Sequence, residues 1–303
     1  MKNLAALILV AALMPGLAVA STEQPVMPQA GVVINTAENM HSRSNTDTDV
    51  VSQALLGMNV KILKAERNAK GEDWYDIETP DTYKGWVVGS SLRLLKPGDK
   101  PYASAGKVFV VMSLFANTYR EPDVTEHRPV KVAPISSVLE FVLEADDRWL
   151  QVVLPCGTKA WVQAGDGEIR EAPWSWPRTT PDDMVALSKR FLGIPYLWGG
   201  TSPRGLDCSG FAQLIYKMSG RPILRDADIQ FEGSGLETVA PGDERAGDLV
   251  FFGRAKDKIG HVGMMISTEE FINATTHEKP VVQISRLKDA YWQHIYQGAR
   301  RAK

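Results

Sequence analysis

Residues 196–211, YLWGGTSPRGLDCSGF, form a glycine-rich stretch that delivers one cysteine to the start of a predicted helix. After Cys208, apolar residues recur at helical spacing as far as Met218, which predicts one buried face, and Gly220 ends the helix. A cysteine in the first turn of a helix is close to unpaired backbone N–H groups and to the positive end of the helix dipole. Both favour the nucleophilic thiolate. We therefore interpret Cys208 as a catalytic nucleophile rather than a small buried thiol.

A thiolate nucleophile needs a base, usually histidine, and the base needs a third group that fixes its tautomer. Among five histidines, His261 starts an apolar run directly after Gly260, so it is either a core histidine or a base at the mouth of a cleft. The third group is either Asn273, on the next predicted strand, or His277 in the turn beyond. Asn273 also fits a strand-end hydrogen bond or a glycosylation acceptor.

The histidines and cysteines show no metal-ligand spacing, so we expect no metal and no cofactor. The net charge is −2 and no long basic run occurs, which argues against nucleic acid as a partner. Only Cys156 and Cys208 are present, and a bridged Cys208 could not act as a nucleophile. We expect Cys156 to be a small buried residue without a function.

Residues 1–20 have the pattern of a signal peptide, with Lys2, an apolar run and a small-residue cleavage site at residues 18–20. We expect a mature protein that begins at Ser21 and is exported to the periplasm, the cell wall or the medium. No later run is long and apolar enough for a transmembrane segment. We expect a monomer.

Two stretches, residues 31–97 and 105–170, consist of short alternating runs separated by turn residues, which predicts β-structure. Both contain a pair of tryptophans twelve residues apart, which indicates an internal repeat: Trp74 and Trp86, and Trp149 and Trp161. Such short copies suit small closed barrels filled by side chains. We expect the four tryptophans to pack in the cores rather than to stack on a ligand.

Residues 171–180 are rich in proline and predict a linker, and residues 181–303 a further domain. Thr180 is expected to cap a helix that starts at Pro181. Beyond the cysteine helix, apolar strands are predicted at residues 247–252, 261–266, 271–274 and 281–284. Helices followed by an antiparallel meander predict an α+β domain.

Together these features resemble the NlpC/p60 family of cysteine peptidases, which cut bacterial cell-wall peptides. The matching motifs are Tyr196, Trp198–Gly200, Asp207–Phe211, Arg225–Asp226 with Gln230, Gly247–Phe252 and Gly260–Gly263. The two β-rich stretches resemble the bacterial SH3-like barrels of exported wall enzymes. The resemblance implies an α+β fold, with a papain-like catalytic domain preceded by two small SH3-like β-barrels.

The resemblance also implies roles. Cys208 would attack the amide carbonyl, His261 would transfer the proton, and Asn273 would orient His261 where the family usually has histidine. The Tyr196 hydroxyl and the backbone N–H of Cys208 would hold the oxyanion. The implied substrate is the γ-D-glutamyl–diamino acid bond, with diaminopimelate or lysine, in peptidoglycan stem peptides or murein fragments. The implied substrate-binding residues are Trp198, Asp207, Ser209 and Asp226.

In relatives with this layout the first barrel closes the cleft, so that only a stem with a free N-terminal L-alanine fits. The matching positions are Asp49, where glutamate is usual, and Tyr83. A carboxylate and a phenol can hold an ammonium group by charge-assisted hydrogen bonds. Otherwise they are an exposed loop acid and an aromatic packed at a turn. Alternative functions are an N-acetylmuramoyl-L-alanine amidase or acyltransferase on the same fold, or a non-catalytic wall-binding protein.

Overall fold

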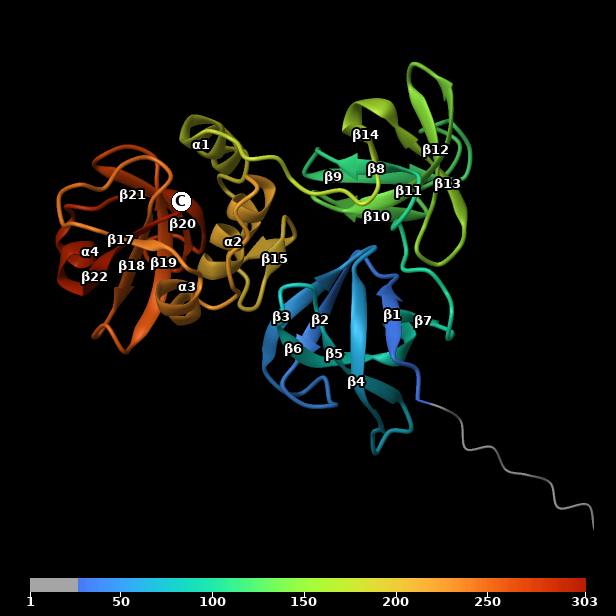
Figure 1. Cartoon of the computed structure of the whole chain (residues 1–303), viewed down its shortest axis with the longest axis horizontal. Helices are drawn as coiled ribbons and strands as arrows, with labels where there is room; N and C mark the ends of the chain where they lie inside the picture. Colours follow the sequence, from blue (N-terminus) through green and yellow to red (C-terminus); the bar gives the residue numbers. More distant parts are fainter. Residues whose placement is uncertain (1–26) are drawn as a thin grey trace, which may run out of the picture.

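The computed structural model describes residues 27–303, so the predicted signal peptide lies outside the described residues. The chain forms two all-β parts, followed by a third part in which helices cover a sheet (Figure 1). Helix α2 and the hairpin strand β15 of the third part lie toward the other two parts, while most of the large sheet lies on the far side. No helix within residues 27–303 is long and apolar enough to span a membrane.

The first part is a seven-stranded antiparallel sheet with the order β3-β2-β6-β5-β4-β1-β7. Its strands are β1 (Ala30–Val33), β2 (Ala37–His41), β3 (Val50–Leu55), β4 (Asn59–Arg67), β5 (Asp73–Glu78), β6 (Lys84–Val88) and β7 (Leu92–Leu95). A short 3-10 helix, η1 (Gly89–Ser91), precedes β7. Its core is filled by aliphatic side chains and Met40, which is fully buried.

The second part is another seven-stranded sheet, with the order β10-β9-β13-β12-β11-β8-β14. Counted from the first strand of each sheet, the two orders are identical, so both parts share one topology. The strands are β8 (Lys107–Val111), β9 (Phe115–Tyr119), β10 (Lys131–Pro134), β11 (Val138–Asp146), β12 (Trp149–Val153), β13 (Lys159–Gln163) and β14 (Gly167–Glu171). The 3-10 helix η2 (Ala164–Asp166) takes the place of η1.

The four repeat tryptophans do not all pack in the cores. Trp74 and Trp149 are buried. Trp86 and Trp161 are only half-buried, so the expectation of core packing is wrong for these two residues. Side chains alternate between the two faces of a strand. In β6 and β13 the core face is taken by the neighbours of each tryptophan, as Val87 shows, so the tryptophan turns outward.

The third part has a six-stranded sheet, β17-β22-β18-β19-β20-β21, and a small hairpin. The strands are β15 (Thr201–Ser202), β16 (Gly205–Leu206), β17 (Glu237–Val239), β18 (Leu249–Gly253), β19 (Ile259–Met265), β20 (Glu270–Thr275), β21 (Val281–Arg286) and β22 (Tyr296–Arg301). The helices are α1 (Pro181–Lys189), α2 (Cys208–Met218), α3 (Ala227–Gly233) and α4 (Ala290–Ile295). The predicted meander is confirmed as β18–β21, whereas β17, β22, α3 and α4 were not predicted.

Helix α2 starts and ends where the sequence predicts. Asp207 is its N-cap, and a side-chain oxygen of Asp207 accepts the backbone N–H of Gly210 at 2.7 Å. The apolar face, with Phe211 and Ile215 fully buried, packs against β19 and β20. Gly220 follows with φ of 68°, the left-handed conformation that terminates helices.

The three parts interlock through single buried side chains. Leu56, from the turn after β3, belongs to the hydrophobic core of the second sheet. Ile135, which follows β10, is fully buried in the core beneath α2. In addition, Val50 of β3 lies so close to Gly199 that a Cβ on the glycine would be 2.8 Å from Val50 Cγ1. The first sheet is thereby fixed against the cysteine loop.

The first turn of α2 tolerates no side chain at Gly210, because an added Cβ would lie 2.2 Å from the carbonyl oxygen of Gly200. We expect Gly210→Ala to destabilise the protein by about 1–3 kcal/mol, since overpacking against backbone forces the loop to shift. Gly165→Ala is the matched control, because its Cβ would meet nothing within 4 Å. Thermal unfolding followed by circular dichroism measures both, and equal melting temperatures would contradict the proposed close approach.

Candidate active site

The Cys208 thiol lies at the first residue of α2 and is 8 % exposed. Burial and the charge of Asp207 raise the pKa of the thiol to about 12, although backbone N–H groups of Val262 and Ser209 act against this. The sequence predicted that the helix terminus favours the thiolate. In the structure burial outweighs that effect, because a charged sulfur loses its hydration. Burial thus favours the neutral thiol in the substrate-free protein.

The Val262 contact places the sulfur against the backbone of β19, at the residue that follows His261. The ladder between β19 and β20 runs through Met264 and Met265 and does not include residues 261–263. The backbone N–H of Val262 is then free to reach the sulfur of Cys208, and α2 packs directly on β19. Thiol and imidazole thus belong to neighbouring elements at the same point of the sheet.

Asn273 determines the tautomer of His261. Its Oδ1 lies 2.9 Å from Nε2 of His261, while its Nδ2 donates to the carbonyl of Gln283 at 3.3 Å and to Oγ of Ser285 at 3.2 Å. Because the amide N–H groups are used on strand β21, the amide oxygen faces the ring. An oxygen only accepts, so Nε2 carries the hydrogen and Nδ1 keeps its lone pair. Nδ1 is therefore the atom that can take a proton.

Aromatic side chains cover part of the His261 ring, and the residue is half-buried. The Trp292 ring stacks on His261 with centroids 5.2 Å apart and an interplanar angle of 26°, and Phe252 lies at 5.8 Å. Burial lowers the pKa of His261 to about 4, although the hydrogen bond with Asn273 acts in the opposite direction. His277, the alternative third group, stacks instead on Tyr291 at 3.8 Å.

Trp292 was not identified from the sequence. It lies on the short helix α4, beyond the last predicted strand, and is 3 % exposed. A single tryptophan without a surrounding motif gives no signal of its own. Only the fold shows that α4 returns to cover the ring of His261.

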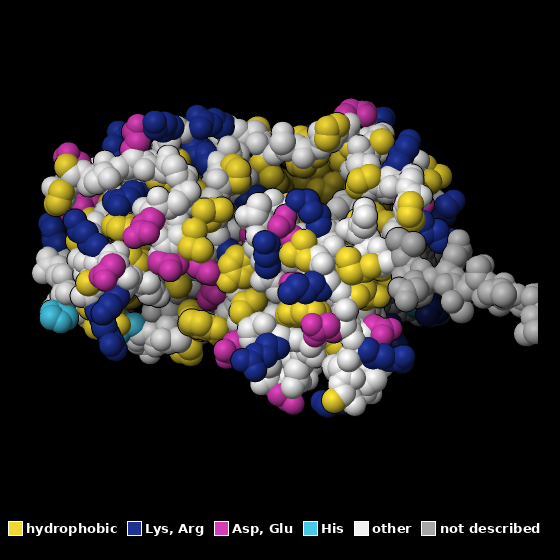
Figure 2. Space-filling model, turned by 60° about the horizontal axis from the view of Figure 1, so that its bottom comes forward, with side chains coloured by type: hydrophobic (Ala, Val, Ile, Leu, Met, Phe, Trp, Pro, Cys, Tyr) yellow, Lys and Arg dark blue, Asp and Glu magenta, His cyan; other side chains and the backbone are white. Residues whose placement is uncertain are grey.

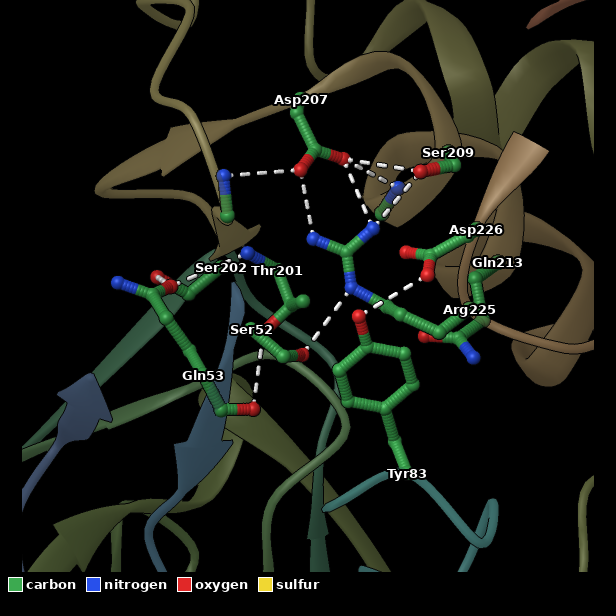
Figure 3. Close-up of polar contacts among 12 residues, drawn as sticks. Ser52, Gln53, Tyr83, Thr201, Ser202, Asp207, Ser209, Gln213, Arg225 and Asp226 are labelled. Atoms are coloured by element: carbon green, nitrogen blue, oxygen red, sulfur yellow. Dashed lines mark hydrogen bonds and ion pairs between the residues drawn. The ribbon is translucent and has the colours of Figure 1, made fainter. Parts of the chain in front are cut away.

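Asp207 and Ser209, predicted to bind substrate, are occupied by internal partners (Figure 3). Asp207 forms a buried bidentate ion pair with Arg225, at 2.6 and 3.0 Å, and also accepts the backbone N–H of Gly199 at 2.9 Å. Arg225 donates to Oγ of Ser209 at 2.8 Å and, through Nε, to Oγ of Ser52 in β3 at 3.1 Å. These contacts assign Asp207 to positioning, because its charge is already neutralised.

Tyr83 of the first sheet reaches into the third part, where its hydroxyl donates to Oδ2 of Asp226 at 2.9 Å. Burial raises the pKa of the Asp226 carboxyl. In the part of the chain that the structure describes, no Lys or Arg forms an ion pair with Asp226, since Arg225 is paired with Asp207. Asp49 is exposed, and the Tyr83 hydroxyl bonds Asp226 rather than Asp49.

Tyr196 and Trp198 lie on the loop before the cysteine. Burial raises the pKa of the half-buried Tyr196, so its hydroxyl stays protonated and can donate. Trp198 is 70 % exposed. Their roles toward substrate stay predictions, as does that of Asp49.

Cys156 is exposed, so the expectation of a buried thiol is wrong. It lies in the turn between β12 and β13, where Gly157 has φ of 87°. Turns cross the surface because their backbone groups need water. Both cysteines are free thiols.

Comparison with known proteins identifies two regions. The NlpC/P60 family model matches residues 193–301, and a bacterial SH3 domain model matches residues 35–93. The chain is 31 % identical over 266 residues to a Bacillus cereus gamma-D-glutamyl-L-lysine dipeptidyl-peptidase, covering 82 % of this chain and 74 % of that protein. It is 23 % identical to dipeptidyl-peptidase 6 of Lysinibacillus sphaericus, covering 80 % of this chain and 87 % of that protein.

Among solved structures, the chain is similar to an NlpC/P60 family protein from Bacillus cereus. The TM-score is 0.76 at 25 % identity, and the match covers 90 % of this chain and 99 % of the other. The predicted family is thus confirmed, together with an SH3-like domain ahead of the NlpC/P60 fold. The chain therefore belongs to the NlpC/P60 family, and it is a cysteine peptidase.

Proposed function

We propose that this peptidase hydrolyses the γ-D-glutamyl–diamino acid amide bond of peptidoglycan stem peptides that carry a free N-terminal L-alanine. Relatives named as a gamma-D-glutamyl-L-lysine dipeptidyl-peptidase and a probable peptidoglycan endopeptidase support the substrate class. The observation that carries the mechanism is the hydrogen bond from Nε2 of His261 to Asn273, on the strand whose backbone contacts the Cys208 thiol. A predicted signal peptide supports action outside the cytoplasm.

The reaction starts from a neutral thiol and a neutral imidazole. As the sulfur of Cys208 attacks the amide carbonyl, its proton passes to Nδ1 of His261, because Nε2 is held by Asn273. The backbone N–H of Cys208 and the Tyr196 hydroxyl stabilise the oxyanion. The C–N bond then breaks, the imidazolium protonates the leaving amine, and a thioester remains. Water, deprotonated by His261, hydrolyses the thioester and restores the thiol.

The free amine of the substrate is recognised by charge. The Asp207–Arg225 pair is neutral as a unit, which leaves Asp226 as an uncompensated carboxylate at the boundary between the first sheet and the third part. Tyr83 occupies only Oδ2 of Asp226. An ammonium group that binds Oδ1 would neutralise the carboxylate, and Asp49 would add a second negative charge from the first sheet.

The surface fits a small charged substrate rather than a polyanion. Figure 2 shows one face on which Lys and Arg are interspersed with Asp and Glu, without a continuous basic stripe on that face. A net charge of −2 agrees with this picture. Recognition is thus left to local charges such as that of Asp226.

The proposed bond is tested with the tripeptide L-Ala-γ-D-Glu-diaminopimelate and with its lysine analogue. We expect release of L-Ala-D-Glu, and complete loss of this release in Cys208→Ala because no other group supplies the nucleophile. Cys156→Ala is the matched control, since its thiol is exposed in a turn of the second sheet. Chromatography of the products measures the result. Activity in Cys208→Ala would exclude the mechanism, and cleavage only between muramic acid and L-alanine would indicate an amidase.

The pH profile tests the neutral pair. The imidazole accepts a proton only when deprotonated, so we expect kcat/KM to rise with pH through about 4 and then to level off. Trp292→Leu admits water to the ring, raises the pKa of His261 toward its usual value and moves this acid limb to higher pH. Asn273→Ala removes a hydrogen bond that raises the pKa, so the limb moves to lower pH.

Asn273→Ala should also lower kcat, by part of the roughly 100- to 10,000-fold that a positioned acid–base group contributes. These shifts are read from kcat/KM between acidic and neutral pH. An acid limb near the ordinary histidine value in the wild type would contradict a desolvated imidazole.

Recognition of the amine is tested by acetylating the N-terminus of the same tripeptide. We expect acetylation to lower kcat/KM roughly 10- to 100-fold, the usual worth of a hydrogen bond to a charged group. Asp226→Asn and Tyr83→Phe should shrink this ratio, because they weaken the site for the ammonium group. Asp49→Ala should shrink it as well, whereas Asp47→Ala, an exposed acid in the same loop, is the control. Equal rates on both peptides would remove this proposal and leave the catalytic one intact.

A further inference from the structure

A cavity of about 490 Å³ lies where the three parts of the chain meet. Strand β3 and the turn after β5 form one wall, residues 136–138 of the second sheet another, and Trp174 of the linker a third. The remaining wall comes from later turns of α2, which include Gln213 and Lys217. Cys208 and His261 are not among its lining residues, so the cavity is distinct from the candidate active site.

Lys217 brings a positive charge to this cavity without a counter-ion. Its Nζ donates to Oγ of Ser136 at 3.3 Å, and within residues 27–303 it forms no ion pair. Burial lowers the pKa of Lys217, while the charge of Asp81 raises it. A partly desolvated ammonium with one weak hydrogen bond is a binding site for an anionic group.

Two further donors in the wall have no partner. Oγ of Ser137 is buried without a hydrogen bond, and the residue is 3 % exposed. The indole Nε1 of Trp174 is likewise buried and unpaired. An unsatisfied buried polar group costs about 1–3 kcal/mol, so native proteins rarely leave two of them at one place. Both atoms lack accessible surface, so among these donors Lys217 is the one that a ligand in the cavity can reach.

A negative charge lines the same cavity. Asp81 accepts from Oγ1 of Thr79 at 2.5 Å and from Nε2 of Gln213 at 2.8 Å, and in the described part of the chain it has no ion pair. Asp81 acts on the pKa of Lys217 without touching it. Lys217 and Asp81 carry opposite charges, line one cavity and form no ion pair with each other. A ligand with both an anionic and a cationic group would complement them.

We propose that this junction cavity binds a free amino acid or a short peptide in its zwitterionic form. Lys217 holds the carboxylate, and Asp81 holds the amine. The volume is within the usual range for small-molecule sites, and apolar wall residues such as Leu214 and Ile223 receive the side chain. The proposal is independent of which bond the peptidase cleaves.

The test uses L-leucine and L-alanyl-L-leucine, which lack a γ-D-glutamyl bond, with the full chain. Binding is followed through the indole N–H resonance of Trp174 in ¹H–¹⁵N spectra, assigned with Trp174→Phe, and by calorimetry. We expect at least one probe to shift this resonance at about 10 mM, where a ligand with Kd of about 1 mM is nearly saturating. N-acetylation of the probe, or conversion to its amide, should weaken binding roughly 10-fold or more.

Lys217→Met should weaken binding roughly 10-fold or more, whereas Lys217→Arg should retain most of it because the charge is kept. Lys189→Met, at an exposed position of α1, is the control. Melting temperatures show that each variant is folded. Tyr83→Phe separates the two sites, because it should leave this affinity unchanged. No shift with either probe, or binding that is lost in Tyr83→Phe and kept in Lys217→Met, would overturn the proposal.

Discussion

The buried ion pair between Asp207 and Arg225 is the constraint on which the site depends. Asp207 caps α2 and so fixes the residue that follows it, Cys208, while its other oxygen holds the backbone of Gly199 in the preceding loop. Arg225 extends this network to Ser52 of the first sheet. Buried ion pairs add little net stability, because desolvation offsets their attraction. The pair therefore acts mainly by positioning. The Asp207 carboxylate fixes the start of α2 and the loop at Gly199, and Arg225 links both to the first sheet.

With Asp207 neutralised, the catalytic pair can remain uncharged until substrate arrives. Asn273 suits such a site, because an amide orients the imidazole of His261 without stabilising its protonated form as strongly as a carboxylate would. The Trp292 ring acts in the same direction, because it excludes water that would stabilise the protonated form of His261. Burial thus raises the pKa of the thiol and lowers that of the imidazole. Separated charges would then form only when the carbonyl is under attack and the oxyanion is held.

Local features of the site could be predicted from sequence, because they depend on residues close in the chain. The start of α2 at Cys208 and the strand that carries His261 follow from spacing and propensity. The contacts of Asp207 and Tyr83 could not, because each depends on a partner far along the chain, 143 residues away for Tyr83. A motif shows that an acid matters, but only the fold shows whether its charge is already paired. Asp207 is paired, whereas Asp226 is not.

The second sheet supports α2 and the end of α1. Ile135 is buried beneath α2, Ser136 accepts from Lys217, and the carbonyl of Met112 accepts from Arg190 at 2.8 Å, after α1. The first sheet holds the start of α2 while the second sheet holds its later turns. The three parts are rounded and meet around α2, so their side chains do not fill all of the space at the junction. The junction cavity is then a geometric consequence of this arrangement, and the opposite charges of Lys217 and Asp81 on its walls distinguish it from an apolar packing void.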